Sequence, residues 1–300
     1  MAKNILVTGA NGQLGKSLRF IESDFSDDFR FVFTDVAELD ITDKTAVLEF
    51  AKKMRADFIV NAAAYTAVDK AESDVAKAYL LNETAVRNLA EVAAEIGAML
   101  VHISTDYVFN GKSRTPYAPD MQPDPVSIYG KSKWAGEQAI HASGCRAAII
   151  RTAWLYSPYG NNFVKTMLRL AESKEKISVV SDQIGCPTLA GDLARFIMRV
   201  LICEGRITAA ATYHFANRGQ ISWFEFAQEI IRQAVKLGAK DCPVVPITTA
   251  DYPTPATRPN FSVFDLSKTT DDFDFDIPDW KESLTKELPK IYHNYKNNIV

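Results

Sequence analysis

Residues 8–15 read Thr8-Gly9-Ala10-Asn11-Gly12-Gln13-Leu14-Gly15, and this stretch decides the fold class. Its glycines have the spacing G-x-x-G-x-x-G and follow an apolar run at 4–8. The first glycine permits a tight exit from a strand, the second lets the backbone approach a pyrophosphate, and the third allows close helix packing. Amides at the start of the following helix would face the phosphates. The stretch therefore predicts a dinucleotide-binding loop between a buried strand and a helix.

Alternating strands and helices extend outward from this loop. Apolar runs and helical patterns predict the following elements: strands at 4–8, 31–35, 57–61, 99–103 and 147–150, and helices at 14–21, 43–54, 73–96 and 131–142. Such alternation implies crossover connections and a parallel sheet with helices on both faces. We therefore predict an α/β fold in which residues 1–150 form a Rossmann-type, doubly wound NAD(P)-binding domain.

The pattern changes beyond residue 151. Helices are expected near 162–174, 190–203 and 222–236, strands near 177–180 and 212–215, and a final helix from Asp279, after a proline-rich loop at 243–260. We assign residues 151–300 mainly to a smaller α/β substrate-binding domain, although the chain is free to re-enter the first domain. No low-complexity linker separates the parts, so we expect them to pack directly together.

The composition excludes several classes of protein. The 300 residues carry a formal net charge of −3, which argues against a nucleic-acid binder that needs a clustered basic face. No apolar run is long enough to cross a bilayer. The four cysteines and four histidines are dispersed without metal-ligand spacing. We expect a cytoplasmic protein with no metal site and no membrane or nucleic-acid partner.

Two further features suit a bound dinucleotide. Asp35 ends the second predicted strand, where a carboxylate can accept hydrogen bonds from the adenosine ribose and repel a 2′-phosphate. Arg30 and Lys16 are near in sequence, so we predict tolerance of NADH and leave NADPH open. The small residues Ala62, Ala63 and Ala64 follow the third strand and leave room for ribose and pyrophosphate. The alternatives are a polar strand end at Asp35 and a turn chosen for packing at 62–64.

A proton-transfer group is predicted at Tyr129 and Lys133. Their spacing places both side chains on one face of a helix, and Thr105 ends the preceding strand. Reduction of a ketone adds a hydride to carbon while an acid protonates the oxygen. We expect the Lys133 ammonium to lower the pKa of Tyr129 and to hold the nicotinamide ribose, and Thr105 to orient the carbonyl.

The same spacing recurs at Tyr292 and Lys296 near the C-terminus. That copy lies on a polar helix with no hydroxyl-bearing strand end before it, so we interpret it as a solvated face. Tyr129 lies in the same alternating domain as the glycine loop, and this context favours it as the catalytic tyrosine.

Together these residues resemble the extended short-chain dehydrogenase/reductases, and more closely the dTDP-4-dehydrorhamnose reductase family. The resembling stretches are VNAAAYTAVDKAE (60–72), STDYVF (104–109), RTAWLY (151–156), GNNFVKTM (160–167), DQIGCPT (182–188) and YPTPATRP (252–259). The resemblance implies reduction of the 4-keto group of dTDP-4-dehydro-L-rhamnose to dTDP-L-rhamnose by NADPH or NADH. The substrate would thus be a dTDP-4-dehydro-6-deoxy-sugar.

The resemblance also implies roles for individual residues. Thr105, Tyr129 and Lys133 would be catalytic. The cofactor would be lined by Gly9, Asn11, Gly12, Gln13, Leu14, Gly15, Asp35, Leu39, Asp40, Ala62, Ala63, Ala64 and Thr66, with Tyr129 and Lys133. Thr105, Asp106 and Trp154 would face the substrate.

Two of the substrate assignments have a physical basis and a competing explanation. Trp154 offers a flat apolar face to a methylated sugar, although a core tryptophan explains it equally well. Arg258 in the proline-rich loop suits a diphosphate, and its alternative is a surface charge.

One departure from the family concerns magnesium. Some members use it at a dimer contact through a glutamate of the first helix, whereas residues 15–19 here contain no acid. We therefore predict no such magnesium site. A homodimer is compatible with the resemblance, but the sequence leaves the oligomeric state open.

Three other functions share parts of this pattern. A sugar-nucleotide 4,6-dehydratase needs an Asp-Glu couple after the strand-end threonine, whereas Tyr107 follows Asp106 here. A 4-epimerase stays open on fold alone, and it would retain NAD tightly. A non-catalytic regulatory subunit, like the accessory subunit of methionine adenosyltransferase, would bind dinucleotide without turnover. The intact Thr105, Tyr129 and Lys133 set favours a reductase.

Overall fold

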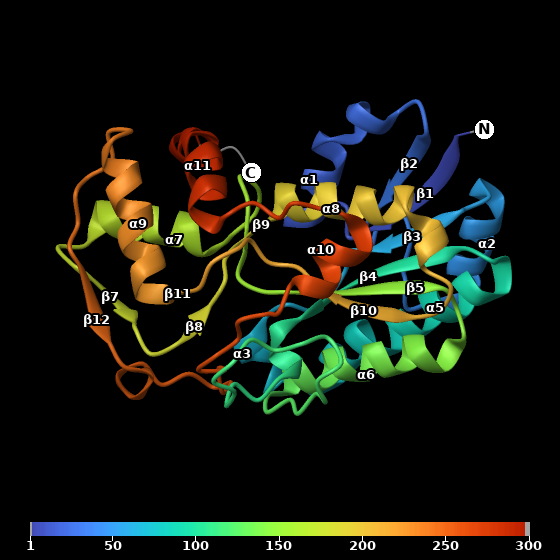
Figure 1. Ribbon diagram of the computed structural model, residues 1–300, viewed down its shortest axis with the longest axis horizontal. Helices are drawn as coiled ribbons and strands as arrows, with labels where there is room; N and C mark the ends of the chain where they lie inside the picture. Colours follow the sequence, from blue (N-terminus) through green and yellow to red (C-terminus); the bar gives the residue numbers. More distant parts are fainter. Residues whose placement is uncertain (1, 298–300) are drawn as a thin grey trace.

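The computed structural model describes residues 2–297, within which six parallel strands form a central sheet in the order β10-β5-β4-β3-β1-β2 (Figure 1). The strands are β1 (Lys3–Thr8), β2 (Phe29–Thr34), β3 (Phe58–Asn61), β4 (Met99–Thr105), β5 (Ala147–Thr152) and β10 (Ala211–His214). The chain runs from β1 to β2 and then crosses to β3 on the other side of β1. The carboxyl ends of β1 and β3 therefore flank the point where a doubly wound sheet binds its ligand.

Helices cover both faces of this sheet. One face carries α1 (Gln13–Phe20), α8 (Ala190–Ile202) and α10 (Ser267–Phe273), and the other carries α2 (Lys44–Met54), α5 (Ala85–Ile96) and α6 (Ile128–Ser143). Short helices α3 (Val68–Ala71) and α4 (Val75–Tyr79) precede a π-helical turn at Leu80–Thr84. Single 3-10 turns lie at Glu22–Phe25, Asp106–Val108, Glu204–Arg206 and Thr249–Asp251.

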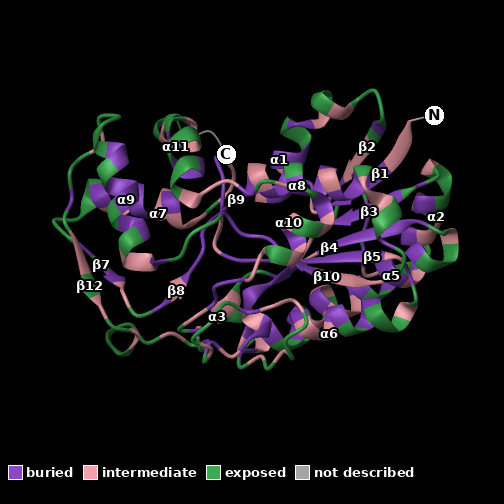
Figure 2. Ribbon diagram, in the orientation of Figure 1, coloured by how far each residue is buried: buried purple, intermediate pink, exposed green. Residues whose placement is uncertain are grey.

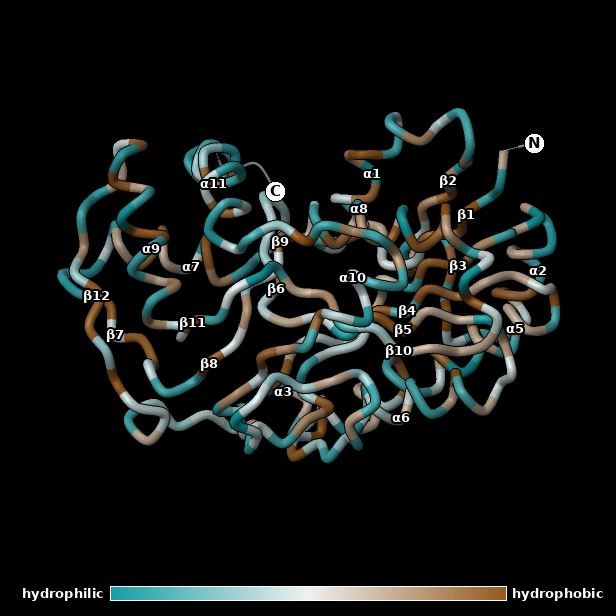
Figure 3. The backbone as a smooth tube through the Cα atoms, viewed as in Figure 1, coloured by the Kyte–Doolittle hydropathy of each residue, from teal (hydrophilic) through white to brown (hydrophobic). Residues whose placement is uncertain are grey.

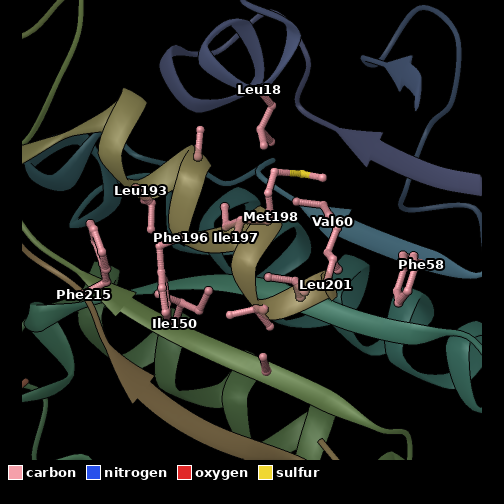
Figure 4. Packing of buried hydrophobic residues seen from close by; sticks show 14 of the residues in the cluster. Leu18, Phe58, Val60, Ile150, Leu193, Phe196, Ile197, Met198, Leu201 and Phe215 are labelled. Atoms are coloured by element: carbon pink, nitrogen blue, oxygen red, sulfur yellow. The ribbon is translucent and has the colours of Figure 1, made fainter. Parts of the chain in front are cut away.

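The strands are buried because their side chains alternate between two apolar layers. Ile5 and Val7 point into the layer under α1 and α8, whereas Leu6 points into the layer under α2 and α5. All three side chains are fully buried, and the inner strands β3, β4 and β5 are buried along nearly their whole length (Figures 2 and 3). In the first layer, Leu193 and Phe196 of α8 lie against the sheet (Figure 4). Burial of this kind contributes roughly 1.5–3 kcal/mol for each large side chain.

The remaining elements form a smaller group beside the carboxyl ends of the sheet (Figure 1). They are β6 (Leu155–Tyr156), α7 (Phe163–Ser173), β7 (Ile177–Val180), β8 (Ile184–Gly185), β9 (Thr188–Leu189), β11 (Ile221–Ser222), α9 (Trp223–Val235), β12 (Val244–Ile247) and α11 (Trp280–Lys296). Strands β7 and β12 pair in parallel, as do β6 and β9, whereas β8 and β11 pair antiparallel. Helices α7, α9 and α11 enclose their own apolar cluster.

The predicted α/β fold class is confirmed, and the local signals act as expected. Asp43 caps α2 by accepting hydrogen bonds from two backbone amides, and Gly97 ends α5 at a φ of 73°. Helix α10 is absent from the sequence expectations, because its Ser-Lys-Thr-Thr-Asp-Asp segment is polar. It is held by Phe273, which packs in the apolar layer between α8 and the sheet, and by Thr269, whose hydroxyl donates to the His214 carbonyl of β10 at 2.6 Å. The predicted domain boundary at residue 150 stays a prediction.

The sequence predicts neither a membrane-spanning helix nor a metal site. No helix within residues 2–297 combines the length and apolar character that a membrane span requires. The same residues hold no cluster of three or more metal-ligating side chains. All four cysteines, each in the described part of the chain, are free thiols.

Candidate active site

A cleft of about 1010 Å³ opens at the carboxyl ends of the central strands. It is lined by these residues predicted from the sequence: Gly9, Gly12, Gln13, Leu14, Asp35, Leu39, Asp40, Ala62, Ala63, Ala64, Thr66, Thr105, Asp106, Tyr129, Lys133 and Trp154. Asn11, Gly15 and Arg258 are not among the described residues that form the lining. The structure thus brings nearly all the predicted site residues into one cavity.

Two glycines of the loop after β1 lie directly against neighbouring backbone. Gly9 has a φ of 70°, and a Cβ there would lie 2.6 Å from the Ala63 nitrogen. A Cβ on Gly15 would lie 2.5 Å from the Ala10 Cα, so only glycine lets α1 pack onto the loop. Gly12 is the N-cap of α1, and within the described chain no side chain caps this helix. The start of α1 therefore keeps its amides for an anion.

The adenosine end of the cleft is organised by Asp35. Its Oδ2 accepts a hydrogen bond from the Asn11 backbone amide at 3.0 Å, and its Oδ1 accepts from the Val36 amide at 2.9 Å. Asn11 thus supports the cleft through its backbone. Asp40 accepts from the hydroxyl and amide of Thr42, which lowers the pKa of Asp40. These contacts fix two carboxylates at one end of the cavity.

Tyr129 and Thr105 meet at the other end. Ser127 caps α6 by accepting from the Gly130 amide at 3.1 Å, which places Tyr129 in the first turn. The Tyr129 hydroxyl has a hydrogen bond with Thr105 at the end of β4. Burial raises the pKa of Tyr129 above its ordinary value of 10, and the bond with Thr105 offsets only part of this. Tyr129 is therefore protonated across the physiological range.

Lys133 lies one turn beyond Tyr129 and is buried. Its Nζ donates to the Ile103 carbonyl at 2.6 Å and lies 3.3 Å from His102 Nε2. Burial lowers the pKa of Lys133 to about 8, with Glu137 acting in the opposite direction. The prediction that Lys133 lowers the pKa of Tyr129 is wrong for this structure. The amino group is directed to β4, and desolvation dominates the environment of the phenol.

Asp106 and Trp154 face the part of the cleft expected to hold the substrate. Asp106 Oδ1 accepts from the Thr105 hydroxyl at 3.0 Å, and the Asp106 carboxylate also interacts with the side chain of Ser262. Burial raises the pKa of Asp106 to about 6. Trp154 has a φ of 48°, which is strained for a bulky residue, and its ring stacks on Trp223 with centroids 3.5 Å apart.

Arg258 is engaged within the protein. Its Nη2 lies 2.7 Å from Asp69 Oδ2, and its Nη1 donates to the Tyr107 hydroxyl at 2.9 Å. These bonds tie the proline-rich loop to α3 and to the turn after β4. A diphosphate would have to share the guanidinium with Asp69.

The model of the "RmlD substrate binding domain" family matches residues 3–293. The chain belongs to the RmlD family. The dTDP-4-dehydrorhamnose reductase of Aggregatibacter actinomycetemcomitans is 41% identical over 93% of this chain and 96% of its own. The dTDP-4-dehydrorhamnose reductase of Escherichia coli K12 is 37% identical over 96% of this chain and 98% of its own. The Bacillus anthracis dTDP-4-dehydrorhamnose reductase, solved in complex with NADP, is 40% identical with a TM-score of 0.89, covering 96% of this chain and 99% of that one.

This RmlD-family cleft also contains residues that the sequence analysis missed. Trp223 begins α9 and joins the lining, as do Gly160 and Asn161 from the loop before α7. Gln13 is held by Ser157 and Asn162, whose side chains donate to its Oε1 at 3.0 and 3.1 Å. No local signal links residue 223 to the glycine loop, since only the fold brings α9 and α1 to one cavity.

The second Tyr-x-x-x-Lys pair of this RmlD-family chain lies on α11. Neither Tyr292 nor Lys296 is among the described residues that line the cleft. Lys296 is paired with Glu172, and Tyr292 packs against the apolar cluster of α7, α9 and α11. The expectation of a solvated face is therefore wrong for Tyr292, which is half-buried, whereas Lys296 is exposed.

Proposed function

We propose that this chain reduces the 4-keto group of dTDP-4-dehydro-L-rhamnose to give dTDP-L-rhamnose, with NADPH or NADH as the second substrate. One observation carries the proposal. The glycine loop and the hydrogen-bonded Thr105–Tyr129 pair line the same cleft. Membership of the RmlD family and the NADP complex of the Bacillus anthracis relative support it.

The residues present fit a dinucleotide. Gly9 and Gly15 keep backbone space that a Cβ would fill, and the uncapped start of α1 offers amides to the pyrophosphate. Asp35 and Asp40 lie where the adenosine ribose would be held, and Ala62, Ala63, Ala64 and Thr66 form the wall beneath it. When bound, the reduced nicotinamide supplies the hydride.

Tyr129 is the proposed proton donor. Its raised pKa keeps the phenol protonated until the substrate oxygen becomes strongly basic. Thr105 holds the phenol by a hydrogen bond and, in our proposal, orients the substrate carbonyl. Lys133, which lies one turn further along α6, is the third residue of the proposed catalytic set.

Asp106 and Trp154 are proposed to contact the deoxysugar. Asp106 lines the cleft, and its carboxylate is an acceptor that suits a sugar hydroxyl. The Trp154 ring offers an apolar face to the sugar methyl group. The role of Arg258 at the diphosphate stays a prediction, as do the homodimer and the cytoplasmic location.

The test is the loss of NADPH or NADH absorbance when purified protein meets dTDP-4-dehydro-L-rhamnose. We expect Tyr129→Phe to lose at least 100-fold in kcat, on the order of general acid catalysis, while cofactor affinity stays within about twofold. Tyr292→Phe is the matched control, because it removes the same hydroxyl from the second Tyr-x-x-x-Lys pair. Failure of the folded wild-type protein to oxidise either cofactor would contradict the proposal.

A further inference from the structure

The side chain of Gln13 joins the glycine loop to the smaller group of elements. Gln13 is the first residue of α1, and its Oε1 lies 3.0 Å from the Ser157 hydroxyl and 3.1 Å from Asn162 Nδ2. Its Nε2 lies 3.5 Å from the Leu155 carbonyl oxygen. These partners belong to segment 154–162, which leads from the end of β5 through β6 to α7. The contacts therefore cross from the cofactor loop to the substrate side of the cleft.

The orientation of the two side-chain amides is fixed by backbone groups. Asn162 caps α7, and its Oδ1 accepts from the Lys165 backbone amide at 3.2 Å, which can only donate. The atom of Asn162 that faces Gln13 is therefore Nδ2, a donor, and it must meet the Gln13 oxygen. Gln13 Nε2 then faces the Leu155 carbonyl, which can only accept. Turning either amide over would oppose like groups, so the link specifies one arrangement.

Both ends of this link lie on the cleft. Gln13 lines it at the start of α1, where no side chain of the described residues caps the backbone amides that suit a pyrophosphate. Trp154, Gly160 and Asn161 line it from segment 154–162. A diphosphate that fixes the backbone of Gln13 therefore also fixes the side chain that holds the opposite wall.

We propose that Gln13 and Asn162 are positioning residues that transmit occupation of the cofactor site to the wall that receives the sugar nucleotide. The backbone of Gln13 serves the cofactor, and its side chain holds the segment that carries Trp154. Coupling between two ligands is reciprocal, so each ligand tightens the binding of the other by the same factor. The inference rests on the proposed function only for the identity of the second ligand.

Two variants break the link in different ways. Gln13→Met keeps the length of the side chain and removes both of its polar groups. Asn162→Ser keeps a good N-cap for α7, but the shorter side chain does not reach Gln13. Thr166→Val is the matched control, because it removes the bond from the Thr166 hydroxyl to the Asn162 carbonyl at 3.0 Å and leaves the link to Gln13 in place.

Hydrogen exchange with saturating NADPH alone tests the link without a sugar nucleotide. We expect NADPH to slow the exchange of backbone amides in segment 154–162 by at least about fivefold in the wild-type protein and in Thr166→Val. In Gln13→Met and Asn162→Ser the change should stay within about twofold, and if one of these variants does not fold, the other decides. Exchange that NADPH leaves unaltered in the wild-type protein, or slows equally in the folded link variants, would overturn the proposal.

Titration calorimetry gives the second readout. The dissociation constant of dTDP-L-rhamnose is measured with and without saturating NADP, and the ratio of the two values is the coupling. We expect a ratio of at least about five in the wild-type protein and in Thr166→Val, and of about one in both link variants. A merely structural loss would weaken binding equally with and without NADP, and an unchanged ratio would exclude the coupling role. Absence of any dTDP-L-rhamnose binding would sink the proposed function and leave the exchange result to decide the link.

Discussion

Gly9→Ala tests whether the loop after β1 is shaped by backbone strain or by close packing. Gly9 has a φ of 70°, and its new Cβ would lie 2.6 Å from the Ala63 nitrogen and 2.7 Å from the Ala62 carbonyl carbon. Ordinary contacts begin near 3.4 Å. The β3–α3 backbone must therefore move by several tenths of an ångström, and it forms one wall of the cleft.

Gly144 provides a matched control at the end of α6. Its φ is 72°, and a Cβ there meets nothing within 4 Å among the described atoms. Gly144→Ala should therefore cost only the left-handed strain of a non-glycine residue, about 1–2 kcal/mol. Gly9→Ala adds overpacking, typically about 1–3 kcal/mol, so we expect a total loss of about 2–5 kcal/mol.

The assay compares free energies of unfolding in urea with NADPH affinity by titration calorimetry. Gly9→Ala should weaken NADPH by at least about tenfold, which corresponds to roughly 1.4 kcal/mol, while Gly144→Ala leaves it unchanged. Equal losses of stability in the two variants, with wild-type NADPH affinity in Gly9→Ala, would refute the packing argument.

Two further predictions concern the carboxylates of the cleft. Asp35→Ser removes the acceptor at the adenosine end, so the ratio of kcat/KM for NADPH to that for NADH should rise at least fivefold, and an unchanged ratio would contradict the role of Asp35. Burial raises the pKa of Asp106 to about 6 from 3.8, so the folded state holds a proton that the unfolded state releases between these values. Stability of the cofactor-free protein should therefore fall as pH rises from about 4 to 6, relative to Asp106→Asn, and parallel urea curves for both proteins across this range would disprove the shift.

Local signals sufficed to predict most of the fold. The glycine spacing, the apolar runs and the caps at Asp43 and Gly97 depend on neighbouring residues, so the sequence displays them directly. The meeting of Thr105 with the glycine loop in one cleft followed from a general rule, that parallel strands bring their carboxyl ends to one edge.

What could not be predicted depends on contacts between distant residues. Trp223 stacks on Trp154 because α9 folds back over the strand ends, and nothing near position 223 indicates this. The environment of Lys133 was misjudged for the same reason. The spacing of Lys133 from Tyr129 is a helical property. Its partner His102, however, lies on β4, and His102 in turn contacts Asn61 of β3.

Elements α8, β10 and α10 follow β5 in the sequence, and this order affects folding during synthesis. Leu193, Phe196 and Phe273 share one apolar layer with Ile5 and Val7 of the first strand. A nascent chain that has reached only the end of β5 therefore exposes the face of the sheet that these helices cover (Figure 4). The cofactor-binding sheet becomes sealed from solvent only after residue 273 has left the ribosome, so a fragment ending near residue 150 would present an aggregation-prone surface.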